Sequence, residues 1–305
     1  MLLAMQGAVS QGILWGIMVL GVFITYKLLD IADLTVDGSF ALGGCVCAVA
    51  VVNYNADPLV AILAALAAGA LAGAVTGFLH TVFEIPAILA GILTQISLWS
   101  INLRVMGKSN TPILSNETIF SRLSDMCGLP TSTVSTIIGL VVAVLMVAVL
   151  YWFFGTEIGS ALRATGNNEA MIRALGVNTK KTKMIALTLS NALVGLSGGL
   201  ICQSQKYADI GMGTGAIVIG LAAIVIGEVL ARLLPGRFTA NFSMRLTSAL
   251  VGSVVFFLIR AIVLQMGMDA NDMKLLSAII VALALCVPVV WEKFKLRTSY
   301  QKGGE

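Results

Sequence analysis

Residues 132–154, STVSTIIGLVVAVLMVAVLYWFF, run directly into residues 155–183, GTEIGSALRATGNNEAMIRALGVNTKKTK. The first stretch is apolar and is long enough to cross a bilayer as a helix, because about 20 residues span the hydrocarbon core. The second stretch is polar and charged, and such a segment is costly to place in lipid. Together they predict a membrane helix that ends in a loop facing water.

The composition of the whole chain indicates the same class. Of 305 residues, 58% are hydrophobic and 11% are charged, whereas soluble domains have about 45–50% and about 25%. The apolar stretches of suitable length are 7–28, 38–53, 58–81, 86–106, 132–154, 183–203, 213–233, 246–267 and 273–291. We therefore predict an all-α, polytopic membrane protein with about nine transmembrane helices. It is expected to form one transmembrane domain over residues 1–305, surrounded by lipid.

The polar loop, residues 155–183, contains a short amphipathic helix. Asn167 is expected to cap this helix, Glu169 lies in its first turn, and Gly176 supplies a left-handed stop. One face is apolar and consists of Ala170, Met171, Ala174 and Leu175. Because two turns are too short to be stable alone in water, we expect this face to dock into a groove on a cytosolic partner.

The basic residues predict the orientation of the chain. If the loop 155–183 is cytosolic, thirteen of the nineteen Lys and Arg residues lie on the cytosolic side: Lys27, Arg163, Arg173, Lys180, Lys181, Lys183, Arg232, Arg237, Arg245, Lys293, Lys295, Arg297 and Lys302. Cytosolic loops of membrane proteins carry such an excess. We therefore expect an amino terminus outside and a carboxyl terminus in the cytosol. The net charge of +4 reflects this topology, and no nucleic-acid partner is expected.

Small residues predict packing rather than chemistry. Gly69, Gly73 and Gly77 recur four residues apart, a spacing that lets transmembrane helices approach closely. Four of the five cysteines, Cys45, Cys47, Cys202 and Cys286, lie in predicted spans and imply no disulfide framework.

A short sequence echo suggests an inverted repeat. Ala32-Asp33-Leu34 precedes the second span and Ala208-Asp209-Ile210 precedes the seventh, and the two would enter the membrane from opposite sides. Helix-breaking residues follow each, at Asp37-Gly38-Ser39 and at Gly211–Gly215, which predicts a broken second helix. Interrupted helices at matching places indicate a transport path. The alternative is a chance similarity over about a dozen residues.

A polar and aromatic face is the candidate for contact with a solute. Gln95, Trp99 and Asn102 share one side of the fourth span, although packing in a dimer would produce the same stripe. Asp37 could cap the second half-helix at the path. The candidate path residues are Asp33, Thr35, Asp37, Ser39, Gln95, Trp99, Asn102 and Asp209.

The chain must obtain energy from elsewhere. It has no G-x-x-x-x-G-K-[ST] loop to hold nucleotide phosphates, and its one His and scattered Cys provide no catalytic or metal constellation. Transport would depend on a separate ATPase, or alternatively on an ion gradient in a self-sufficient secondary transporter.

The ionisable residues of such a carrier also have structural explanations. His80 and Glu84 can pair at a helix end, and Glu228 can pair with Arg232 one turn later. Arg260 can extend to the membrane surface, or it can hold Asp209 at an outer gate.

Three motifs resemble one family of membrane transporters. ADLTVDGSFALG (32–43), NNEAMIRALGVN (167–178) and GLAAIVIG (220–227) are similar to permease subunits of ATP-binding-cassette importers of the ribose and branched-chain amino acid group. Within it, LTVDGSF, SINLRVMGKSN and MIRALGVNT are most similar to permeases described as tryptophan/tyrosine transport subunits. One departure is Glu228, where ribose-type relatives tend to have Gly.

The resemblance implies an importer in a bacterial cell membrane. Its permease would be a homodimer, with two ATP-binding subunits on the cytosolic side and an extracytoplasmic substrate-binding protein. ATP and Mg would bind to the partner ATPase, and this chain would hold no cofactor. The coupling helix would comprise Asn167, Asn168, Glu169, Ala170, Met171, Ile172, Arg173, Ala174, Leu175 and Gly176. The solute is expected to be an amino acid, with an aromatic one favoured.

Overall fold

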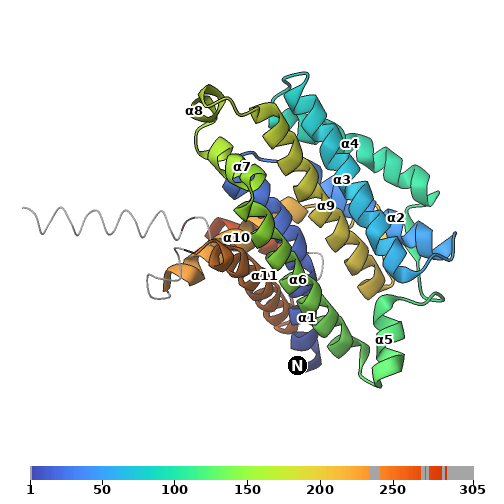
Figure 1. The fold of residues 1–305 in the computed structure, drawn as a ribbon. Helices are drawn as coiled ribbons and strands as arrows, with labels where there is room; N and C mark the ends of the chain where they lie inside the picture. Colours follow the sequence, from blue (N-terminus) through green and yellow to red (C-terminus); the bar gives the residue numbers. More distant parts are fainter. Residues whose placement is uncertain (1, 234–240, 269–271, 273–274, 284–285, 287–305) are drawn as a thin grey trace, which may run out of the picture.

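The computed structural model describes residues 2–233, 241–268, 272, 275–283 and 286. The helices are α1 (Leu2–Phe23), α2 (Thr35–Val52), α3 (Pro58–Thr81), α4 (Ala87–Met106), α5 (Ile119–Cys127), α6 (Thr131–Gly155), α7 (Glu157–Asn167), α8 (Glu169–Ala174), α9 (Thr179–Gln205), α10 (Ala216–Leu233) and α11 (Phe242–Gln265) (Figure 1). A π-helical turn, η1 (Ile24–Leu28), extends α1, and two short strands, β1 (Asn110–Pro112) and β2 (Tyr207–Asp209), complete the set.

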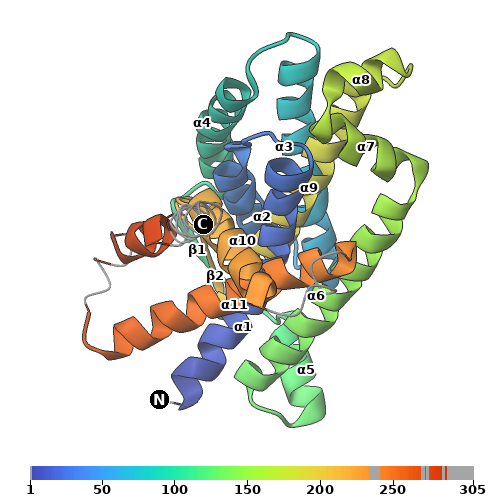
Figure 2. The ribbon, with the colours of Figure 1, turned by 90° about the vertical axis from the view of Figure 1, so that its left-hand side faces the viewer.

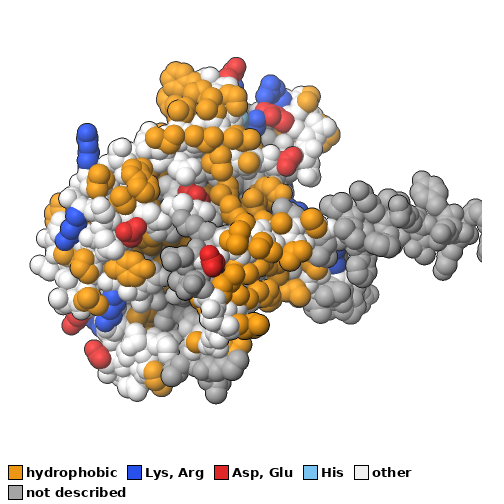
Figure 3. Space-filling view, turned by 180° about the vertical axis from the view of Figure 1, so that it is seen from behind, with side chains coloured by type: hydrophobic (Ala, Val, Ile, Leu, Met, Phe, Trp, Pro, Cys, Tyr) orange, Lys and Arg blue, Asp and Glu red, His pale blue; other side chains and the backbone are white. Residues whose placement is uncertain are grey.

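The helices confirm an all-α, polytopic membrane protein. Seven stretches within the described residues are long and apolar enough to cross a bilayer: Ala4–Leu28, α2, α3, α4, α6, α9 and α11. The span expected at 213–233 is α10, which contains Glu228 and Arg232, and the span expected at 273–291 lies partly outside the described residues. The count of nine therefore stays a prediction. Many large hydrophobic side chains are exposed, as expected of a protein surrounded by lipid, and some of them form patches on the face in Figure 3, which also carries charged side chains.

The centre of the bundle is α9, which packs against α3, α2 and α1. In an apolar stretch of 18 residues within α9, 83% of the residues are buried, against 22% in the corresponding stretch of α6. A Cβ on Gly195 would lie 2.5 Å from the backbone oxygen of Ala65, and one on Gly69 or Gly73 would overlap the backbone of α9. The backbones of α3 and α9 therefore touch, which confirms that this glycine row is a packing face.

The first interruption lies before α2 and not inside it. The chain at 29–34 is not helical, and Asp30 has a φ of +57°. From Thr35 the helix α2 is continuous to Val52, so the break predicted at Asp37–Ser39 is wrong in position. The glycine at position 38 allows close packing and does not interrupt the helix, because a Cβ there would lie 2.9 Å from the Leu98 side chain of α4.

The second interruption precedes α10. β2 pairs antiparallel with β1, with Asn110 opposite Asp209, and both strands contact α2 (Figure 2). After β2 the chain runs along α2, where the Met212 side chain packs against Gly44. The two Ala-Asp motifs form the same local turn, because Asp33 accepts a hydrogen bond from Thr35 N (3.0 Å) and Asp209 accepts one from Gly211 N (2.7 Å). This likeness supports the interpretation as a repeat.

Candidate coupling surface and solute path

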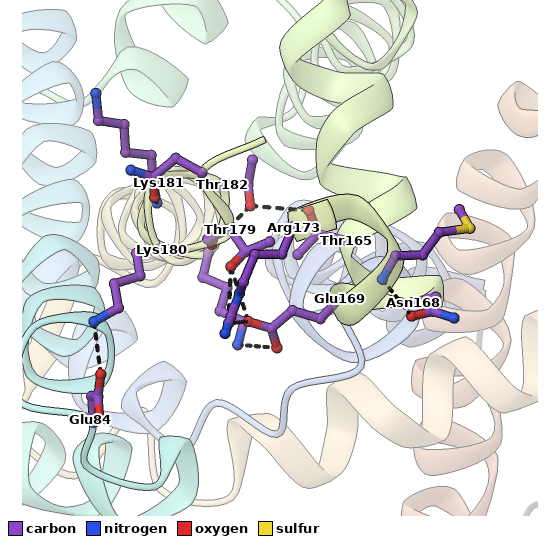
Figure 4. A network of polar contacts seen from close by, with 12 residues as sticks. Glu84, Thr165, Asn168, Glu169, Arg173, Thr179, Lys180, Lys181 and Thr182 are labelled. Atoms are coloured by element: carbon purple, nitrogen blue, oxygen red, sulfur yellow. Dashed lines mark hydrogen bonds and ion pairs between the residues drawn. The ribbon is translucent and has the colours of Figure 1, made fainter. Parts of the chain in front are cut away.

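The polar loop folds into two capped helices. Thr156 caps α7 by accepting from Gly159 N at 3.3 Å, and Asn168 caps α8 by accepting from Met171 N at 3.0 Å (Figure 4). The prediction that Asn167 is the cap is wrong by one residue, because Asn167 is still the last residue of α7 and the extended backbone falls at Asn168. The left-handed stop is confirmed at Gly176, whose φ is +88°.

Glu169 ties α8 to the start of α9. Its carboxylate accepts hydrogen bonds from Arg173 (2.7 Å), Thr179 (3.1 Å) and Lys183 (2.6 Å) (Figure 4). The hydrogen bond from Lys183 is the main cause that lowers the pKa of Glu169 below its ordinary value. Two cations and one hydroxyl on one carboxylate therefore hold in place a helix that is too short to persist alone.

The apolar face of α8 points away from the protein. Ala170, Met171, Ala174 and Leu175 are all exposed, with Met171 at 54% and Leu175 at 71%. Ile172, by contrast, is buried at 6% exposure and packs beneath the helix. The anchoring role of Ile172 was missed, because an apolar side chain next to an apolar face gives no separate signal in the sequence.

The turn between α3 and α4 contacts the same region. Glu84 Oε1 lies 2.8 Å from Lys180 Nζ, and this hydrogen bond lowers the pKa of Glu84. The predicted pair of His80 and Glu84 is wrong: Glu84 lies beyond the end of α3 with a φ of +56°, and His80 Nδ1 instead lies 2.8 Å from Ile85 O. We call α8 with Glu84 and Lys180 the coupling surface.

Three of the predicted path residues belong to buried polar networks. Asn191 of α9 donates to Asp33 Oδ2 at 2.6 Å and accepts from Ser39. Thr35 contacts Thr76 of α3 at 2.8 Å. All five side chains are buried. Asp33, Thr35 and Ser39 therefore join α2 to its neighbours, and none of them lines the cavity described below.

Asp37 caps a helix other than its own. Its carboxylate accepts from Gly215 N at 2.8 Å and from Ile217 N at 2.9 Å, which are free donors at the first turn of α10. The predicted cap at the start of a second half-helix is therefore wrong, because α2 already begins at Thr35.

The structure contradicts one of the two explanations given for Arg260, and it adds a partner for Glu228. Within the part of the chain that the structure describes, no carboxylate lies within 4.0 Å of Arg260, so no ion pair joins it to Asp209. Glu228 Oε1 lies 2.8 Å from Lys27 Nζ of η1, a partner from another helix that the sequence did not suggest.

A cavity of about 520 Å³ lies beside the interruption that precedes α10. It is lined by Gln11, Trp15, Phe40, Ile201, Gln205, Tyr207, Met212, Thr214, Gly215, Val218, Ile219, Phe257, Arg260, Ser277 and Ala278. The Trp15 ring packs 4.6 Å from Phe40 and 5.5 Å from Phe257, and the Arg260 guanidinium lies 5.8 Å from the Phe257 ring. An aromatic floor with a few polar groups is typical of small-molecule sites.

The face predicted on α4 does not reach this cavity. Gln95, Trp99 and Asn102 are absent from its lining. Trp99 is 50% exposed on the outside of the bundle, whereas Asn102 is buried and its Nδ2 lies 3.5 Å from Gly38 O. The structure of the single chain therefore separates these residues into an outward and an inward group.

Comparison with known proteins identifies the family. The family model described as "Branched-chain amino acid transport system / permease component" matches residues 4–286. A tyrosine transport system permease protein of Clostridioides difficile is 37% identical over 91% of this chain and 90% of its own. An uncharacterized protein of Rickettsia prowazekii is 30% identical over 91% and 95%, and the ribose import permease protein RbsC of Escherichia coli is 27% identical over 84% and 76%. The resemblance drawn from the three motifs is confirmed. The chain therefore belongs to the family of branched-chain amino acid transport system permease components, and it is a multi-pass transport permease rather than an enzyme.

Proposed function

We propose that this permease forms the path by which an aromatic amino acid enters the cell in an ATP-driven importer. The observation that carries the choice of solute is the cavity beside α10, which is lined by three aromatic rings and by the Arg260 guanidinium next to one of them, Phe257. The guanidinium suits a solute carboxylate, and the rings suit an aromatic side chain. The tyrosine transport permease with which the chain shares 37% identity supports the same class.

We propose further that the coupling surface receives the motion of an ATPase. Two ATP-binding subunits would dock on the two copies of α8 in a permease homodimer, and a separate binding protein would deliver the solute on the opposite side. ATP and Mg would bind to the ATPase. The exposed apolar face of Met171 and Leu175, on a helix fixed from behind by Glu169 and Ile172, supports this assignment.

The proposed orientation, with the amino terminus outside, predicts how native cysteines react. Cys127 is exposed at the end of α5, while Cys45, Cys47 and Cys202 are buried. In a Cys286→Ser variant, we expect a membrane-impermeant maleimide to label Cys127 in intact cells. In a Cys127→Ser/Cys286→Ser background, Lys181→Cys should react only after permeabilisation. Labelling of Lys181→Cys in intact cells would reverse the orientation.

The function is tested by uptake into proteoliposomes that contain the permease with its ATPase and binding protein. We expect ATP-dependent accumulation of tyrosine or tryptophan in preference to leucine and ribose. Arg260→Gln should lower the apparent affinity for the solute by about tenfold or more, because hydrogen bonds to charged groups contribute about 1.5–3 kcal/mol. Arg104→Gln, at an exposed arginine in the last turn of α4 and outside the cavity, serves as the matched control.

Two results would contradict the proposal. Uptake of ribose without tyrosine or tryptophan would replace the solute class. Uptake by this chain alone, driven by a proton or sodium gradient without ATP, would instead establish the secondary transporter.

A further inference from the structure

Three basic side chains converge on the side of the bundle where α8 lies. Lys27 of η1, Arg163 of α7 and Arg245 of α11 line a cleft of about 430 Å³ together with Ser160 and Asn167. These elements are far apart in sequence, so the fold itself gathers the charges. Lys27 is paired with Glu228 at 2.8 Å. For Arg163 and Arg245, no ion pair is formed with any residue that the structure describes.

Both uncompensated guanidiniums are held in place by aromatic rings. The Arg163 guanidinium lies 5.2 Å from the ring of Phe242, and that of Arg245 lies 5.8 Å from the ring of Phe23. The Arg163 Nε–H is buried without a hydrogen-bond acceptor among the described residues. The seven residues before Asn241, 234–240, contain no Asp or Glu that could neutralise either guanidinium. A buried donor of this kind favours an external anion as its partner.

A second cleft adjoins the first and indicates the level of the bilayer at which the anion would lie. It has a volume of about 630 Å³, shares Arg163 and Phe242 with the first cleft, and extends over Tyr151 and Trp152. These two residues are 57% and 72% exposed near the end of the membrane-spanning α6. Exposed Tyr and Trp at the end of a span are typical of the headgroup level of a bilayer.

We propose that Lys27, Arg163 and Arg245 bind the phosphate headgroup of an anionic phospholipid from the leaflet on the α8 side. The two guanidiniums donate to the phosphate oxygens, and the glycerol and upper acyl carbons lie over Trp152 in the second cleft. Basic pockets between transmembrane helices bind lipid headgroups in this way, and arginine is well suited to phosphate. Because Asn168 alone separates α7 from α8, the bound lipid fixes the helix from which the coupling surface projects.

The proposal is tested by native mass spectrometry of the purified chain released from mixed micelles. Phosphatidylglycerol and phosphatidylcholine with the same acyl chains are supplied in equal amounts. We expect the wild-type chain to retain phosphatidylglycerol at least tenfold more than phosphatidylcholine, and Arg163→Gln/Arg245→Gln to lose this preference. Arg104→Gln/Lys108→Gln removes two exposed charges in the last turn of α4 and just after it, outside both clefts, and should behave as wild type.

Inorganic phosphate distinguishes a lipid from a free anion. We expect millimolar phosphate to leave the thermal unfolding of the wild-type chain unchanged, whereas phosphatidylglycerol raises its midpoint. An equal rise with phosphate, lost in Arg163→Gln/Arg245→Gln, would overturn the lipid assignment, and so would an unchanged lipid preference in that variant. If the double variant does not fold, Arg245→Gln at an exposed position replaces it, with a several-fold loss of preference as the expected result.

Discussion

Replacing Met171 and Leu175 with aspartate is expected to abolish solute-stimulated ATP hydrolysis by the assembled importer. Both side chains are more than half exposed on α8, and the proposed docking would bury them in an apolar groove. A carboxylate buried there without a partner costs several kcal/mol, which is enough to prevent docking. The measurement is ATPase activity in nanodiscs, with and without the loaded binding protein.

The design separates docking from folding. Neither Met171 nor Leu175 contributes a side chain to the Glu169 network or to the buried contact of Ile172, so the permease should keep its size-exclusion profile and its thermal stability. Met171→Leu/Leu175→Met keeps the face apolar and should retain stimulation. Wild-type stimulation in the aspartate variant would remove α8 from the interface.

Replacing Asn191 with leucine should destabilise the permease by about 3–5 kcal/mol, because the Asp33 carboxylate would be left buried without its main side-chain donor. Asn191 is 0% exposed and Asp33 is 2% exposed, and they are joined at 2.6 Å. The free energy of unfolding can be measured by titration with SDS in a Cys127→Ser/Cys286→Ser background. There the buried thiols react with a fluorogenic maleimide only on unfolding.

A double-mutant cycle assigns this loss to the charge. Asp33→Asn removes the carboxylate, so Asp33→Asn/Asn191→Leu should be more stable than Asn191→Leu alone. Ser190→Ala is the matched control, since it removes a neutral hydrogen bond to Gly21 O of 2.7 Å one residue away and should cost only about 1 kcal/mol. An Asn191→Leu loss as small as that of Ser190→Ala would show that the network contributes little.

The sequence predicts well what depends on neighbouring residues. Hydropathy predicted the spans that correspond to α3, α6 and α9. The spacing of Gly69 and Gly73 predicted the face of α3 that contacts α9. The cap of α8 was misplaced by one residue because Asn167 and Asn168 are equally good caps. Which of them is used depends on where α7 ends.

The sequence does not predict contacts that depend on the relative placement of distant helices. Asp37 is 178 residues from the Gly215 amide that it caps, and Lys27 reaches Glu228 from another helix. Each residue also has an adequate explanation within its own segment. The candidate solute face shows the same limit, since helical periodicity grouped Trp99 with Asn102 although only one of them is buried.

The cap that Asp37 provides for α10 joins α2 and α10 into one mechanical unit. Its two hydrogen bonds anchor the first turn of α10 to α2, so a rotation of either helix carries the other with it. If the joined helices move, we expect the backbone to bend in the non-helical stretches that lead into them, at 29–34 and at 210–215. The second of these stretches contains three glycines, and Gly215 has a φ of +84°, a conformation that favours glycine. Two non-helical stretches that lead into one joined pair of helices would let the permease open toward one side of the membrane while it closes toward the other.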